Sequence, residues 1–208
     1  MGQVGPAGRS AVGRGPRMRA AVLAATLAEL AERGYAALTV DTVARRAGVH
    51  KTSIYRRWGD RESLVVDALS EHIASDIPMP DTGAVASDLR LMARALVRWA
   101  TSTAGQAIVA ALLTDAVQSP ELADARRRIF DDRLRRAEPV IARAVARGEL
   151  PPETDPAEVV KSMAAPIYFR LLITGEPLDE DIADRAAEIA LVAANAGALR
   201  ATVRERPA

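Results

Sequence analysis

Apolar residues recur at helical spacing along most of the chain. The segment 17–33 places its bulky apolar side chains on one helical face and meets Gly34 directly afterwards, which favours a helix and its stop. Similar stripes run through 89–99, 108–117, 120–148 and 157–174, and from 179 onward. No segment shows the strict alternation of a strand. The pattern predicts an all-α fold.

Two short helices are predicted between residues 39 and 58. Thr39 can cap the first and Gly48 can end it, while Ile54 and Trp58 form an i, i+4 apolar pair in the second. Helices this short are unstable alone in water, so they must pack against neighbours. The preceding helix and the one that starts at Asp60 supply those neighbours. The preceding helix and the two short helices make a three-helix, helix-turn-helix unit at the N-terminal end, and the helix from Asp60 packs against it.

Breaks in the pattern divide the chain into three parts. Residues 1–15 hold many glycines and few bulky apolar side chains, which is typical of a flexible basic arm. Pro78, Pro80 and Gly83 prevent the preceding helix from continuing. We therefore expect one unit over 16–77 and a second over 84–200, the latter a C-terminal helical bundle.

Composition narrows the chemistry that this chain can perform. Its 208 residues are 49% apolar and 26% charged, and they include no cysteine and two histidines. Thiolate sites and histidine-built metal centres are therefore excluded, and we expect neither metal nor cofactor. No apolar run approaches the roughly 18 residues of a membrane span, and the start lacks a secretory signal pattern. These features predict a cytoplasmic protein with no membrane partner.

The charge is unevenly distributed. The first 60 residues hold ten basic and four acidic side chains, a net charge of +6, whereas the rest of the chain carries −5. A basic end on an acidic body is expected when that end binds a polyanion such as nucleic acid. A basic tail that is merely solvated is the alternative. Four arginines near the start would reach into a minor groove on the first interpretation and would only be solvated on the second: Arg9, Arg14, Arg17 and Arg19.

The second short helix has an outer face suited to DNA. With Ile54 and Trp58 turned inward, hydroxyl and basic side chains point outward and no carboxylate lies among them. Such side chains donate hydrogen bonds to phosphate oxygens and base edges, as a helix in the major groove must. A generic helical hairpin within a bundle is the alternative.

The stretch TVDTVARRAGVHKTSIYRRWGDRESLV resembles the helix-turn-helix of the tetracycline-repressor (TetR) family. It is most similar to the subgroup whose turn and recognition helix have the pattern AGVHKTxxYRRW. The resemblance covers roughly Pro16 to Ile77. It implies an all-helical regulator that binds a palindromic double-stranded DNA operator as a homodimer, with one recognition helix per subunit. A ligand-responsive repressor is the expected activity.

The resemblance also implies roles for individual residues. Thr39 and His50 would lie at helix starts near phosphates, Tyr55 would contact the duplex backbone, and Arg61 would contact a phosphate. The residues predicted to contact DNA are Thr39, Arg45, His50, Lys51, Thr52, Ser53, Tyr55, Arg56, Arg57 and Arg61.

For the C-terminal part, the resemblance implies a site for a small hydrophobic or amphipathic effector and dimerisation through the last two helices. Pro139 and Pro166 interrupt helical patterns, so we expect bends that open space between helices. Ordinary core packing is the alternative for every candidate lining residue. The predicted pocket residues are Met92, Leu96, Trp99, Leu113, Phe130, Met163 and Tyr168. The predicted inner stripe of the last helix is Ile182, Ala186, Ile189 and Ala193.

Two other functions stay open at this stage. The chain could be a helical small-molecule-binding or interaction protein with a non-functional DNA module. An enzyme is a weaker possibility, because no phosphate loop, metal-ligand spacing or Ser-His-Asp arrangement occurs.

Overall fold

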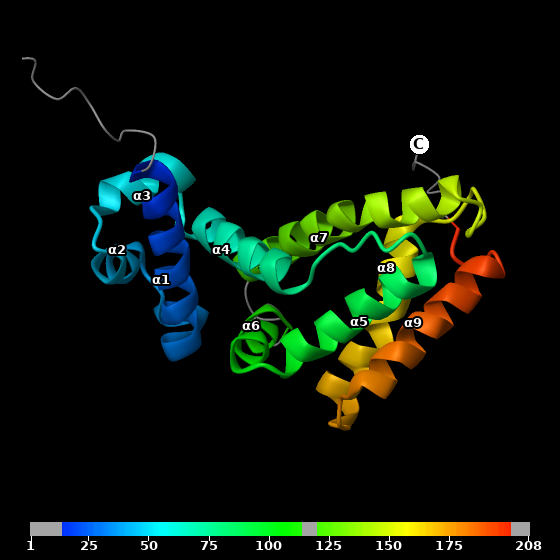
Figure 1. Cartoon of the computed structure of the whole chain (residues 1–208). Helices are drawn as coiled ribbons and strands as arrows, with labels where there is room; N and C mark the ends of the chain where they lie inside the picture. Colours follow the sequence, from blue (N-terminus) through cyan, green and yellow to red (C-terminus); the bar gives the residue numbers. More distant parts are fainter. Residues whose placement is uncertain (1–13, 114–119, 201–208) are drawn as a thin grey trace, which may run out of the picture.

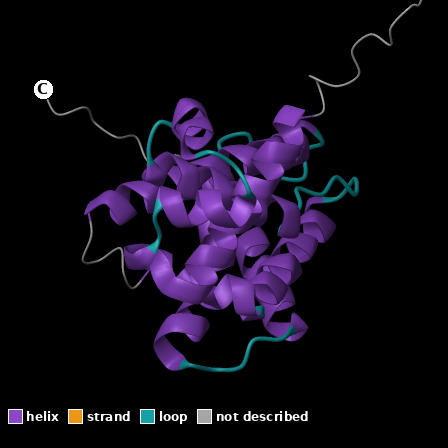
Figure 2. Ribbon diagram, turned by 90° about the vertical axis from the view of Figure 1, so that its left-hand side faces the viewer, coloured by secondary structure: helices purple, strands orange, loops and turns teal. Residues whose placement is uncertain are grey.

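The computed structural model describes residues 14–113 and 120–200. Within these ranges all regular elements are helices, and the one strand-like pairing is an isolated bridge between Thr154 and Arg200 (Figure 2). The predicted all-α fold is confirmed. Across the same ranges, none of the helices has both the length and the apolar character needed to cross a bilayer.

The N-terminal unit consists of α1 (Arg14–Ala37), α2 (Val40–Ala47), α3 (Lys51–Trp58) and α4 (Arg61–Asp76). Helix α1 starts at Arg14, so its first two residues lie in the segment predicted to be part of the arm. The rest of that segment, residues 1–13, lies outside the described residues. At Gly34 the backbone leaves the helical conformation with a φ of 72°, which is the predicted stop.

Helices α2 and α3 form because their ends are capped. The Thr39 hydroxyl accepts a hydrogen bond from the Thr42 amide, and Gly48 takes the left-handed conformation at the end of α2 with a φ of 66°. Asp60 caps α4 in the same way by accepting from the Ser63 amide. These local signals place the two short helices at the positions that the sequence predicted.

The C-terminal unit is a bundle whose long helices pack side by side. Its elements are α5 (Val85–Thr101), α6 (Thr103–Leu113), α7 (Pro120–Ala146), α8 (Pro156–Phe169), a π-helical turn η2 (Arg170–Thr174) and α9 (Glu180–Asn195). Figure 1 shows α1, α2 and α3 at one end of the molecule, with α4 leading from them to α7, while α5, α8 and α9 lie at the other end.

The inner face of α9 differs from the predicted stripe. Five alanines are buried against neighbouring helices, whereas Ile189 is 52% exposed and Ile182 is only partly buried. Small side chains let α9 approach α5 and α8 closely, so the alanine face turns inward and the bulkier residues remain outside. Of the predicted stripe, only Ala186 is buried. The buried residues are Ala183, Ala186, Ala187, Ala190 and Ala194.

Hydrogen bonds from α7 and from the loop after it hold the segment that joins the two units. Arg133 donates to the carbonyl of Ile77 at 2.6 Å, and Arg143 donates to the carbonyl of Pro80 at 2.8 Å. The Val85 amide at the start of α5 donates to Glu149. Because α4 also packs along α7, α4 is in direct contact with the C-terminal bundle.

Candidate DNA-binding surface and effector cavity

Helix α3 is anchored from behind by two side chains. Ile54 is fully buried, and Trp58 packs against the core while its indole nitrogen donates to Oδ2 of Asp67 at 2.8 Å. The other carboxylate oxygen of Asp67 accepts from Arg19 at 2.7 Å. One carboxylate on α4 therefore links α1 and α3 and fixes the orientation of α3.

The opposite face of α3 is open to solvent. Lys51, Thr52, Tyr55, Arg56 and Arg57 are all exposed, and α3 lies at the end of the molecule away from α8 and α9 (Figure 1). Ser53 is half-buried at the edge of the same face. The structure thus brings the predicted hydroxyl and basic side chains together on one surface.

The charges of this surface are only partly neutralised within the subunit. Lys51 forms an exposed ion pair of 3.1 Å with Asp41 of α2, a carboxylate that the sequence reading of α3 alone did not include. The Arg57 guanidinium lies 5.5 Å from the centre of the Trp58 ring. Arg45 and Arg56 are exposed and have no hydrogen-bond or ion-pair partner among the described side chains. Their guanidinium groups are therefore available for an external anion.

Thr39 and His50 stand at the starts of α2 and α3. The Thr39 hydroxyl is engaged in a reciprocal cap with Thr42, at 3.1 Å and 3.3 Å. The His50 side chain makes no capping hydrogen bond and is exposed. Free amides and the helix dipole make such helix starts favourable for anions.

Arg61 is engaged inside the subunit. Its guanidinium lies 4.4 Å from the centre of the Tyr35 ring and donates to Glu62 at 3.0 Å and to the Leu38 carbonyl at 3.4 Å. A phosphate contact would have to compete with these partners, so we leave Arg61 out of the proposed interface. Arg19 is likewise paired, with Asp67 and Glu71. Sequence spacing gave no sign of these long-range pairs.

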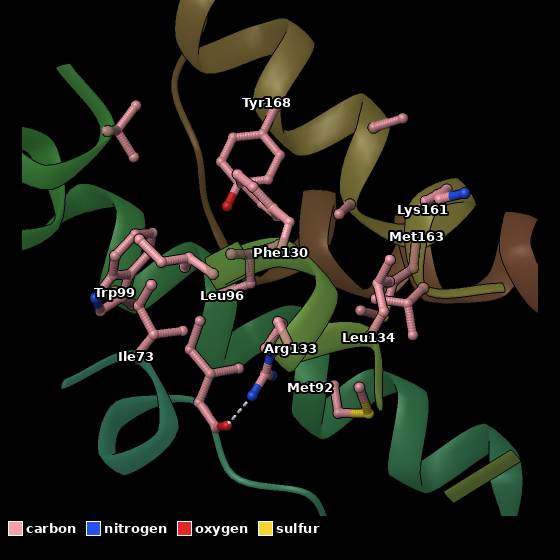
Figure 3. A pocket seen from close by; sticks show the side chains of 16 residues that line it. Ile73, Met92, Leu96, Trp99, Phe130, Arg133, Leu134, Lys161, Met163 and Tyr168 are labelled. Atoms are coloured by element: carbon pink, nitrogen blue, oxygen red, sulfur yellow. Dashed lines mark hydrogen bonds between the residues drawn. The ribbon is translucent and has the colours of Figure 1, made fainter. Parts of the chain in front are cut away.

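A cavity of about 330 Å³ lies between α4 of the N-terminal unit and helices α5 to α8 of the C-terminal unit. Figure 3 shows labelled side chains converging on it from α5, α7 and α8. A volume of this size falls in the range of sites for small molecules. The side chain of Leu113 lies outside the described part of the chain. The six other predicted pocket residues all line the cavity: Met92, Leu96, Trp99, Phe130, Met163 and Tyr168.

The lining is apolar apart from a few groups. Burial raises the pKa of the Tyr168 hydroxyl to about 12, and burial lowers the pKa of the Arg133 guanidinium to about 10. The indole nitrogen of Trp99 is buried and has no hydrogen-bond partner among the described residues. Lys161 also lines the cavity, and it pairs with Glu158 at 2.7 Å.

Neither of the two prolines predicted to open space between helices is itself a lining residue. Both Pro139 and Pro166 lie within helices, but neither lines the cavity. The α7 residues that do so, from Ile129 to Leu134, precede Pro139 by more than one turn. Pro166 lies between the lining residues Ala165 and Tyr168 and shortly before the π-helical turn η2. The residues that line the space come from α4, from Ile77 directly after it and from α5 to α8.

Arg133 is the functional candidate that the sequence analysis missed. It lies in a run of charged residues that reads as a solvated helix face. A signal was present, because Ile129 and Ala137 lie four residues before and after it and both are buried. That spacing places Arg133 on the inner face of α7.

The structure combines an exposed basic helix of a helix-turn-helix with a helical bundle that has an apolar cavity. This combination is typical of a helical DNA-binding regulator. Two family profiles match the chain: "Bacterial regulatory proteins, tetR family" over residues 22–68 and "Tetracyclin repressor-like, C-terminal domain" over residues 79–190. The chain belongs to the TetR family of transcriptional regulators.

Individual relatives agree with this membership. The HTH-type transcriptional regulator AqdR of Rhodococcus erythropolis is 34% identical over 184 residues, which cover 88% of each chain. The DNA-binding transcriptional repressor TetR of Mycobacteroides abscessus is 35% identical, over 81% of this chain and 89% of its own. The crystal structure of the TetR family transcription regulator SCO0332 is 32% identical, with a TM-score of 0.72 over 85% of this chain and 97% of that chain. The chain is a DNA-binding transcriptional regulator.

Proposed function

We propose that this protein is a ligand-responsive repressor that binds a palindromic operator as a homodimer. The observation that carries the proposal is the outer face of α3, where exposed basic and hydroxyl side chains are held by the buried Ile54 and by the Trp58–Asp67 hydrogen bond. A relative at 35% identity is named a DNA-binding transcriptional repressor, which supports repression as the outcome.

On this proposal α3 enters the major groove. Arg56 reads a base edge and Tyr55 contacts the backbone, while the exposed helix starts at Thr39 and His50 face phosphates. Arg45, Lys51 and Arg57 add charge around the groove. Thr52 and Ser53 complete the set of hydrogen-bonding side chains.

Dimerisation is proposed to occur through α8, η2 and α9. Ile173 is 70% exposed and Val192 is 62% exposed, and Phe169, Leu172 and Ile189 are exposed on the same elements. Several exposed large apolar side chains on consecutive elements favour a protein partner. The same surface of a second copy of this chain would cover these side chains in a two-fold symmetric dimer. A palindromic operator requires that symmetry.

Ligand control requires a connection between the cavity and α3, and α4 provides one. Asp67 in the middle of α4 holds Trp58 of α3, while Ile73 near the end of α4 and Ile77 directly after it line the cavity. An effector that favours a different position of α4 shifts the spacing of the two recognition helices. A coupling free energy of about 1–3 kcal/mol is typical of such linked sites.

The proposal is tested by selecting binding sites from random duplexes with the purified protein and sequencing the enriched pool. We expect an inverted repeat, retarded in a mobility shift at low salt and lost steeply as salt rises. An enriched pool without two-fold symmetry would contradict dimeric operator binding. Retardation of no duplex would contradict the DNA-binding role.

The interface is tested separately with two variants that introduce the same charge. Ile173→Asp lies in the proposed interface and Tyr55→Asp lies on α3. Light scattering after gel filtration should show a monomer for Ile173→Asp and a dimer for Tyr55→Asp. A dimer in both would place the interface elsewhere.

A further inference from the structure

Arg133 is a partly buried cation that lines an otherwise apolar cavity. Its guanidinium donates one hydrogen bond, to the backbone carbonyl of Ile77 at 2.6 Å, and Figure 3 draws this bond at the edge of the cavity. A neutral carbonyl stabilises a buried guanidinium less than a carboxylate does. The group is therefore placed where an added anion would stabilise it strongly.

Arg133 forms no ion pair with a carboxylate in the described part of the chain. The adjacent Asp132 is paired with Arg135 at 3.3 Å and with Arg136 at 2.7 Å. Glu158 of α8 lies two residues before the lining residue Val160 and is paired with Lys161. Neither acidic side chain forms an ion pair with the Arg133 guanidinium.

Tyr168 adds a second polar group to the same region. Its phenol lines the same cavity as Arg133. A tyrosine hydroxyl is protonated at neutral pH, and burial raises the pKa of Tyr168 further, to about 12. A protonated phenol donates a hydrogen bond, and a guanidinium only donates. The two groups together favour an acceptor that carries negative charge.

From this geometry we infer that the effector is an apolar molecule that ends in a carboxylate, which Arg133 binds in exchange for the Ile77 carbonyl. The inference rests on the proposed ligand-responsive function and specifies its ligand class. The apolar body fills the space beside Met92, Leu96 and Phe130. Charge-assisted bidentate bonds to the carboxylate replace a single bond to a neutral carbonyl.

This exchange of hydrogen-bond partners also explains how ligand binding would affect the position of α4. Ile77 follows the last residue of α4, and its own amide donates to the Ile73 carbonyl. Loss of the Arg133 bond removes the direct hydrogen bond between α7 and the Ile77 carbonyl. The end of α4 then gains freedom to move relative to α7.

The test measures displacement of the fluorescent probe 8-anilinonaphthalene-1-sulfonate by decanoate and by 1-decanol, which share an alkyl body of similar length. Wild-type protein should bind decanoate at least tenfold more tightly than 1-decanol. In Arg133→Met, which keeps much of the aliphatic stem, this preference should disappear. Arg135→Gln removes an exposed cation from the same helix outside the cavity and should keep it.

Hydrogen exchange gives an independent measurement on the wild-type protein. Decanoate should speed amide exchange in the peptide 73–82, and 1-decanol should leave it nearly unchanged. In Arg133→Met the same peptide should exchange faster before any ligand is added. Thermal unfolding of each variant checks that it is folded, and the wild-type comparison of the two probes requires no variant.

The outcomes separate this inference from the proposed function. Equal affinity for decanoate and 1-decanol in the wild-type protein overturns the carboxylate preference while leaving an apolar effector site intact. Binding of neither probe, together with no displacement of the dye, overturns the ligand site and the inference with it. An unchanged preference in Arg133→Met overturns the role of Arg133 alone.

Discussion

The indole nitrogen of Trp58 donates a hydrogen bond of 2.8 Å to Oδ2 of Asp67, and this bond joins the end of α3 to the middle of α4. Both side chains are partly buried, so water competes with the bond only in part. The same carboxylate accepts from Arg19 of α1. The orientation of α3 therefore depends on one acidic side chain on the helix that also reaches the cavity.

Trp58→Phe should lower both stability and DNA affinity. The substitution keeps an aromatic ring but leaves one oxygen of Asp67 without its donor, at a cost of about 1–2 kcal/mol in the free energy of unfolding. Chemical denaturation measures this cost, and fluorescence anisotropy with the selected operator measures affinity. In a double-mutant cycle with Asp67→Ala, the coupling energy should be about 1 kcal/mol. A coupling near zero would show that the bond does not hold α3.

The caps of the two short helices predict a contrast between Thr39 and His50. Thr39 takes part in a reciprocal cap with Thr42, whereas His50 makes no side-chain capping bond. Thr39→Ala should therefore destabilise the protein by about 1 kcal/mol, and Thr39→Ser should restore most of that loss. His50→Ala should leave the melting temperature nearly unchanged. An equal effect of the two alanine substitutions would contradict the observed capping geometry.

Local features of the fold were predictable because neighbouring residues determine them. The cap at Thr39, the left-handed Gly48 and the inward pair of Ile54 and Trp58 all follow from helix periodicity and end chemistry. The apolar cavity residues were found for a related reason. Large side chains on the inner stripes of α5, α7 and α8 converge wherever those helices pack together.

Features that depend on tertiary contacts were not predictable from spacing. Ile189 turns outward because the alanine face of α9 fits more closely against its neighbours, and both faces of α9 carry apolar residues. Arg61 is engaged by Tyr35, which lies 26 positions earlier in the chain. Arg133 meets Ile77 across 56 positions. Only the packed structure shows that these groups meet.

The N-cap of α4 predicts a pH-dependent contribution to stability. The Ser63 amide donates to Asp60 at 2.6 Å, and this hydrogen bonding lowers the pKa of the Asp60 carboxyl below its usual range. A lowered folded-state pKa stabilises the protein above the unfolded pKa of about 3.9 and loses that effect as pH falls through the folded value. Melting temperatures of wild type and Asp60→Asn, measured between pH 6 and pH 2.5, should converge on the acid side. Parallel curves would show that Asp60 does not titrate differently in the folded state.

Arg56 offers the most direct test of the recognition surface. It is exposed on the outer face of α3 and has no partner among the described side chains, so its substitution disturbs no observed contact. Arg56→Ala should weaken operator binding by about 1–3 kcal/mol and relax the preference at one base position if the side chain reads a base edge. A phosphate contact would instead weaken all sequences alike and reduce the slope of log K against log salt by about 0.9.

Arg127→Ala is the matched control for Arg56→Ala. Arg127 is a strongly exposed cation on α7 that pairs with Asp124, so its substitution removes the same charge far along the chain from α3. Anisotropy titrations with the selected operator and with scrambled duplexes, each at several salt concentrations, distinguish the two kinds of contact. Equal losses of operator affinity in both variants would show that Arg56 contributes only through the net charge of the protein. A loss confined to Arg56→Ala on the selected operator assigns base recognition to the outer face of α3.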